Sequence, residues 1–235
     1  MNTSNTDRKK NEQQNAVIDI FTGNPLSSLS KERIIRLSPE YDGLCMLYST
    51  NRTDPEKLYS MKILGWGIRS NGEIVGVVPW LNNIVACNNL CDPDSGVFEG
   101  YYDPANGQIF DQPPAHKITE LETASRYYNY DQEPADTLLQ EIPDSIGTHA
   151  MLNCDQANSL ILTEVLSWQL LNNGEIQAML IDEELVDATP VLPGDPSLYP
   201  AKENPDFRYF FQHHIANQIK SEDPDALAAL SLLLQ

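Results

Sequence analysis

The clearest signal in the chain is GWGIRSNGEIVGVVPWL, residues 65–81. Asn71-Gly72 lies there between two β-rich runs, and an Asn-Gly pair tolerates the positive φ angles that a tight hairpin turn requires at both central positions. The second arm, residues 74–78, is apolar without alternation, which indicates a strand buried on both faces. Pro79 lacks a backbone N–H, so pairing is expected to end there or to lie at the margin of a sheet.

A second hairpin is predicted at residues 97–110, VFEGYYDPANGQIF, because Asp-Pro and Asn-Gly supply turn residues between two β-rich runs. The connection at residues 80–96, WLNNIVACNNLCDPDSG, is long for a simple turn, and long ordered loops are often functional. The continuous apolar run at residues 41–50, YDGLCMLYST, predicts a buried strand. The first half therefore predicts an antiparallel meander.

The second half favours helices. Apolar residues share one helical face in PPAHKITELETASRYY, residues 113–128, and DQANSLILTEVLSWQLLN, residues 155–172, begins with a capping Asp and ends at Asn-Asn-Gly. The Asn-Pro and Asp-Pro pairs that precede residues 206–222 and 225–235 predict two further helices. EIQAMLI, residues 175–181, is expected to be a strand. Shorter helices are predicted at residues 28–37, 53–64 and 133–142.

These elements predict an α+β fold, in which hairpins of the first half form an antiparallel sheet and helices mainly from the second half pack on one face. Residues 1–15 are almost wholly polar and are expected to form a disordered tail, with residues 16–235 as a single domain. The segments at 70–78, SNGEIVGVV, and 172–180, NNGEIQAML, are alike. A turn followed by a strand would produce that likeness anyway, so no internal repeat is predicted.

The chain has 235 residues, with 34 Asp and Glu against 15 Lys and Arg, which gives a formal net charge of −19. Such a surface repels nucleic-acid phosphate and favours partners with basic patches. The longest apolar segment is too short to cross a bilayer, and no secretory signal is recognised. We therefore expect a cytoplasmic protein that binds neither nucleic acid nor membrane.

Two patterns in the chain resemble parts of metal sites. Cys87 and Cys91 resemble part of a zinc site that His116, His149 or Cys154 further along the chain would complete, but a second closely spaced pair of ligands is missing. Asp92, Asp94 and Glu99 resemble half of a calcium loop without the spacing of an EF-hand. Buried thiols and an ordinary turn explain both patterns, so the sequence predicts no metal and no cofactor.

The first functional hypothesis is a non-catalytic acidic protein that acts through protein–protein contacts. It depends on the negative charge and on two candidate contact segments, the proline-rich arm at residues 190–205 and the predicted apolar C-terminal helix at 225–235. The partner would be another protein or a second copy of this chain.

The alternative is an enzyme or a small-ligand-binding protein with a pocket between the 65–81 hairpin and the 81–96 loop. Aromatic side chains beside a few polar groups are typical of such pockets. The candidate polar residues are Arg69, Glu99, Tyr101, Tyr102 and His116. The sequence names no reaction, ligand or oligomeric state, and the same residues would serve equally well for packing between strands.

Overall fold

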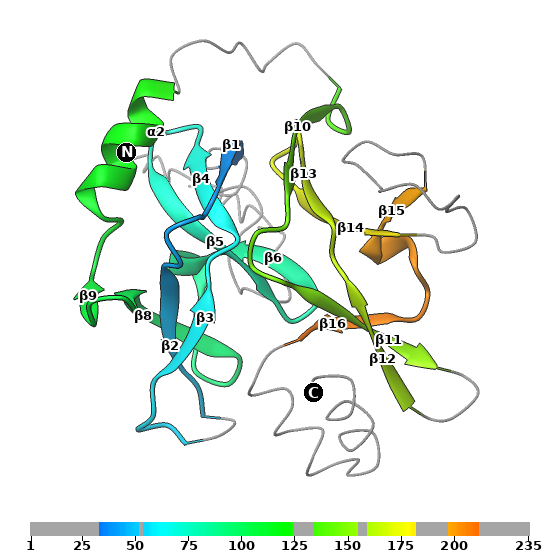
Figure 1. Ribbon diagram of the computed structural model, residues 1–235, viewed down its shortest axis with the longest axis horizontal. Coiled ribbons are helices and arrows are strands. Elements are labelled where there is room, and N and C mark those ends of the chain that lie inside the picture. The colour runs from blue at the N-terminus through cyan, green and yellow to red at the C-terminus, as the bar shows by residue number, and fades with distance from the viewer. Residues whose placement is uncertain (1–32, 52–53, 125–133, 155–158, 182–196, 212–235) are drawn as a thin grey trace, which may run out of the picture.

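The computed structural model is mainly β, with four antiparallel sheets arranged as a four-bladed propeller (Figure 1). It describes residues 33–51, 54–124, 134–154, 159–181 and 197–211. The predicted α+β fold is therefore wrong: across the described ranges one short α-helix accompanies the sheets, and no layer of helices covers one face.

The first half forms two of the sheets. One has the strand order β1-β4-β5-β6, and the other has the order β3-β2-β8-β7, with β9 paired to β8. The strands are β1 Ile34–Pro39, β2 Cys45–Ser49, β3 Tyr59–Lys62, β4 Gly65–Arg69, β5 Ile74–Trp80, β6 Asn83–Ala86, β7 Cys91–Asp92, β8 Gly96–Asp103 and β9 Gln108–Phe110. The 3-10 helix η1 (Cys87–Asn89) follows β6, and the α-helix α2 (Ala115–Ala124) follows β9.

The second half forms the other two sheets, with the orders β10-β13-β14-β15 and β12-β11-β16. Its strands are β10 Leu138–Pro143, β11 His149–Cys154, β12 Ser159–Glu164, β13 Ser167–Leu171, β14 Ile176–Ile181, β15 Leu198–Pro200 and β16 Phe207–Phe210. The 3-10 helix η3 (Ala201–Glu203) follows β15, as η1 follows β6. In Figure 1 the two halves lie side by side, with β1 and β10 close together between them.

The two halves repeat one pattern of strand pairing. β1 pairs with β4 as β10 pairs with β13, and β2 pairs with β3 and β8 as β11 pairs with β12 and β16. Even the irregularities recur. The β1–β4 ladder shifts between Ile34 and Arg36, and the β10–β13 ladder shifts between Leu138 and Gln140. The expectation that the chain has no internal repeat is wrong.

The sequences of the repeats also match over ILGWGIRSNGEIVGVV, residues 63–78, and VLSWQLLNNGEIQAML, residues 165–180. In both turns the side chain of the Asn before the Gly accepts the backbone N–H of the following Glu, at 2.8 Å. Gly72 and Gly174 both have φ of +88°, a conformation that L-amino acids with a side chain rarely adopt. The similarity at the turns is therefore part of a longer equivalence between residues 63–78 and residues 165–180.

Each half has its own hydrophobic core. In the first half Trp66 and Tyr101 are buried together, and in the second half Trp168 and Phe210 take the equivalent places. Equivalent core positions differ in size, as in this list of pairs: Met46 and Ala150, Gly76 and Ala178, Ile63 and Val165, Cys87 and Ala201. Leu37, Leu64 and Val77 of the first half extend the second core across the boundary.

Several predicted elements are confirmed. The 65–81 stretch forms the β4–β5 hairpin, the 97–110 stretch forms β8 and β9, and strands lie at 45–49 and 176–181. A helix lies within 113–128, at Ala115–Ala124. These segments carry local signals, namely turn dipeptides, a continuous apolar run or a single helical face.

The other helix predictions are wrong wherever the chain is described. Residues 155–172 contain strands β12 and β13, which turn at Val165 and Leu166, and the described part of 206–222 contains β16. Strands also replace the shorter helices predicted at 28–37, 53–64 and 133–142. A short apolar run suits a buried strand or a buried helix equally, and pairing with distant strands decides between them. Residues 1–32 and 225–235 lie outside the described residues.

Candidate functional site

Arg69 joins the β4–β5 hairpin to the 3-10 helix η1, which lies within the 81–96 segment. Its Nη1 donates to Glu73 Oε2 at 2.8 Å, and its Nη2 donates to Asn88 Oδ1 at 3.0 Å and Asn89 Oδ1 at 2.8 Å. Asn88 Nδ2 in turn donates to Glu73 Oε1 at 2.9 Å. The guanidinium is buried, and these bonds satisfy it within the protein. Arg69 therefore fixes the loop against the hairpin at the place where the sequence suggested a pocket.

Tyr101 has a structural contact as well. It is buried, and its hydroxyl accepts the backbone N–H of Gly76 at 3.0 Å. Burial raises the pKa of Tyr101, while the bond from Gly76 and the nearby charge of Arg69 act in the opposite direction. The phenol thus stays protonated at neutral pH.

The remaining predicted site residues lie elsewhere. Glu99 is exposed and accepts a hydrogen bond from Ser49 Oγ at 2.7 Å. Tyr102 is half-buried and lies opposite Ile109 in the β8–β9 ladder. His116 is exposed on α2, with Nε2 3.5 Å from Asp42 Oδ2. The structure brings Arg69 near Tyr101 but does not gather the five predicted residues into one site.

Sequence reasoning missed a buried charged network beneath α2. The Glu40 side chain is fully buried, and it accepts a hydrogen bond from Trp66 Nε1. Lys117 Nζ lies 3.5 Å from Glu40 Oε2 and 2.8 Å from Asp42 Oδ2, with only 7% of its side chain exposed. A buried charge is costly without a partner, so this network ties α2 to the β1–β2 connection.

The network shifts two ionisation equilibria. The hydrogen bond from Lys117 lowers the pKa of Asp42, against an opposing effect of burial, and His116 lowers it further. Burial by itself would lower the pKa of Lys117, but the hydrogen bond to Asp42 and the charges of Glu40, Asp42 and Glu120 together raise it. At neutral pH Asp42 and Lys117 therefore carry opposite charges.

The second half contains a counterpart of the Trp66–Glu40 bond. Trp168 Nε1 donates to Asp144 Oδ1 at 2.9 Å, as Trp66 does to Glu40. The Thr148 backbone N–H and hydroxyl donate to the Asp144 carboxylate at 2.8 and 3.0 Å. A tryptophan–carboxylate bond at the end of the first strand is therefore common to both halves. Aligning the two halves is the one sequence signal that would have revealed it.

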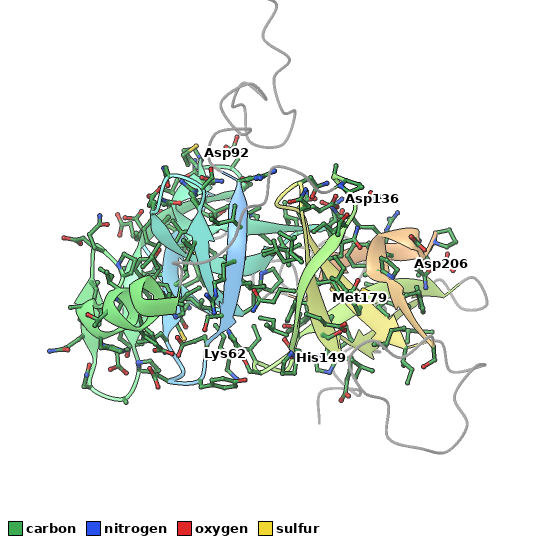
Figure 2. The ribbon with its side chains drawn as sticks, turned by 90° about the horizontal axis from the view of Figure 1, so that it is seen from above. Lys62, Asp92, Asp136, His149, Met179 and Asp206 are labelled. Carbon is green, nitrogen blue, oxygen red and sulfur yellow. The ribbon has the colours of Figure 1, made fainter. Side chains whose placement is uncertain are left out.

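Tyr41, next to this network, is the most exposed large hydrophobic residue among the described residues, at 71%. It lies between Glu40, which is buried, and Asp42, which is exposed, in the connection between β1 and β2. The equivalent connection of the second half lies against it, since Ser145 Oγ donates to Glu40 O at 2.9 Å and Lys62 Nζ donates to Ile146 O at 3.4 Å. Figure 2 shows Lys62 on the face of the molecule opposite to Asp92 and Asp136.

The two metal patterns have ordinary geometry. Cys87 is buried and Cys91 is exposed, both as free thiols. The Asp92 carboxylate accepts the Asp94 N–H at 3.0 Å and the Ser95 hydroxyl at 3.2 Å, which closes a turn. Among the described residues, no group of three His, Cys, Asp or Glu side chains is placed to hold a metal ion.

The proline-rich arm at residues 190–205 is described from residue 197 onward. There Leu198–Pro200 pairs with β14, and Ala201 is buried in the second core. This part of the arm belongs to the fold, whereas its beginning and residues 225–235 lie outside the described residues. In the described portion of the chain, no helix is long and apolar enough to cross a membrane.

The chain matches no protein-family model, and it has no significant similarity to any curated protein or solved structure. The residues and contacts described above are therefore the basis for any functional proposal.

Proposed function

We propose that this protein is a non-catalytic interaction module that binds a basic segment of a protein partner at the face around Tyr41. The observation that carries the proposal is the 71% exposure of Tyr41 on a loop whose neighbouring residues are both anchored. Tyrosine supplies a large amphipathic contact surface and is enriched among the residues that dominate binding energy at interfaces.

The anchoring of the loop favours binding. Glu40 is fixed by Trp66 and Lys117 on one side of Tyr41, and Asp42 is fixed by Lys117 on the other. An aromatic side chain presented on a rigid loop loses little conformational entropy when a partner binds. Tyr41 is therefore preorganised for contact.

The charge indicates the kind of partner. Asp42 and Glu120 are 55% and 62% exposed beside Lys117, whose own charge is buried. The chain as a whole carries −19. Such a field speeds the approach of cationic partners and disfavours acidic ones.

The alternative of an enzyme or ligand receptor has weaker support from the contacts. The candidate residue Arg69 is bonded to Glu73, Asn88 and Asn89, and Tyr101 is bonded to Gly76. These side chains would have to break internal hydrogen bonds before they could bind a ligand, and an unpaired buried group costs about 1–3 kcal/mol.

Selection from a random peptide-display library tests the proposal. We expect the enriched peptides to be rich in Arg and Lys, and Tyr41→Ala to weaken the binding of one synthesised peptide about tenfold or more, as loss of an anchor side chain does. Leu58→Ala is the matched control, because Leu58 is 49% exposed and precedes Tyr59, which pairs with Tyr48 at the end of β2 far from Glu40 and Asp42. Enriched peptides without basic residues, or equal affinity for both variants, would contradict it.

A thermal-shift screen against metabolites distinguishes the alternative, because a small ligand that binds only the folded state raises Tm. A reproducible rise that Arg69→Lys abolishes and Tyr41→Ala leaves intact would favour the ligand receptor over the interaction module.

A further inference from the structure

The equivalence of the two halves extends to hydrogen bonds outside the ladders. Leu64 N donates to Val77 O at 2.9 Å, and Leu166 N donates to Met179 O at 3.0 Å. Three more backbone bonds of the first half have a counterpart in the second half. Ile63 N–Leu44 O corresponds to Val165 N–Thr148 O, and Glu40 N–Leu64 O corresponds to Asp144 N–Leu166 O. Ser70 N–Arg33 O corresponds to Asn172 N–Thr137 O. The two halves therefore share one pattern of backbone hydrogen bonds.

The boundary between the halves brings equivalent elements together. β1 and β10 occupy the same position in their sheets and lie against each other. The Gln140 side chain joins them, since Leu37 N donates to its Oε1 at 3.0 Å and its Nε2 donates to Leu37 O. An interface in which a patch meets its own counterpart is typical of a twofold pair of identical subunits.

Further contacts close the same boundary. Phe210 N donates to Leu81 O at 2.6 Å, which ties β16 to the turn between β5 and β6. A Cβ atom on Gly174 would lie 2.7 Å from Arg33 Cβ, so the β13–β14 turn packs directly on the chain that enters β1. Leu37, Leu64 and Val77 add apolar contact to these polar ones.

We infer that the chain is two fused copies of one two-sheet unit, and that the surface of each unit around β1 or β10 is a binding surface for a second copy of that unit. Most of each core comes from one copy, whereas Gln140, Leu37 and the Phe210–Leu81 bond act between copies. The inference does not depend on the Tyr41 proposal. Tyr41 corresponds to Ser145 in the second copy, so the proposed partner face is a feature of the first copy alone.

Cutting the full chain between the copies tests this inference. A site-specific protease sequence is inserted between residues 128 and 129, in the connection from α2 to β10, and the folded protein is cut. We expect the two fragments to elute together as a 1:1 complex in size-exclusion chromatography with light scattering. Gln140→Glu, which cannot donate to Leu37 O, should weaken the fragment complex about tenfold or more.

Lys202→Met is the matched control, because the Lys202–Glu175 pair lies within the second copy. It should leave the affinity between fragments unchanged. Fragments that separate as folded monomers would overturn the binding surface, and fragments that lose their near-ultraviolet circular dichroism on cutting would overturn the independence of the units. If Gln140→Glu and Lys202→Met weakened the complex equally, Gln140 would make no specific contribution to the interface.

Discussion

Lys117 and Glu40 form an ion pair in which 7% and 0% of the two side chains are exposed, with Nζ and Oε2 3.5 Å apart. The lysine comes from α2, and the glutamate follows β1. Within the described part of the second half, the corresponding carboxylate of Asp144 accepts its hydrogen bonds from Thr148 and Trp168.

Lys117→Met is expected to lower the free energy of unfolding by about 3–5 kcal/mol, because it leaves the Glu40 carboxylate buried without a cation. Urea unfolding at pH 7 measures the loss. Lys202→Met is the control: its partner Glu175 is 38% exposed, so the loss there should stay below about 1 kcal/mol. Adding Glu40→Gln to Lys117→Met should recover part of the stability, and a further loss would contradict the argument.

Asp42→Asn is expected to flatten the dependence of stability on acid pH. The pKa of Asp42 is lower in the folded protein than its ordinary value, chiefly through the hydrogen bond from Lys117. The stabilisation is therefore complete above the ordinary pKa and is lost as the pH falls through the folded pKa. Urea midpoints from pH 7 to pH 2 test this. The exposed Asp111→Asn should follow the wild-type curve, and equal curves for all three proteins would refute the assignment.

Gly72→Ala and Gly174→Ala should differ although both glycines have φ of +88°. The left-handed conformation costs about 1–2 kcal/mol in each variant. A Cβ on Gly72 meets no atom within 4 Å, whereas one on Gly174 lies 2.7 Å from Arg33 Cβ. We expect Gly174→Ala to lose at least about 1 kcal/mol more, through overpacking. Thermal unfolding of the two variants tests this, and equal Tm values would show that Arg33 moves aside without a cost in stability.

Tyr101→Phe is expected to cost about 1–3 kcal/mol, because the Gly76 N–H loses its acceptor in the core. Tyr102→Phe serves as the control, since Tyr102 is only half-buried. Chemical unfolding of both variants provides the comparison. If the loss for Tyr101→Phe did not exceed that for Tyr102→Phe, the Tyr101–Gly76 bond would contribute nothing to stability.

The candidate site was only partly accessible from sequence. The sequence points to His116, but its neighbour Lys117 makes the buried contacts with Glu40 and Asp42. Nothing local distinguishes a lysine that will be buried from one that will be solvated, because its burial depends on where α2 packs. The sequence suggests a pocket residue at Arg69, whereas in the structure Arg69 bonds to Asn88 and Asn89 of η1.

The local elements were determined by the sequence itself. Asn71-Gly72 can form its hairpin turn because the preference for positive φ belongs to the residues of the turn. The helix at Ala115–Ala124 likewise follows from one apolar face. Tertiary structure decided that residues 159–171 form two strands, because their apolar side chains suit helix and strand alike until β11 and β14 pair with them. It also decided the pairing of the two copies across β1 and β10, since a contact between residues a hundred positions apart leaves no local trace in the chain.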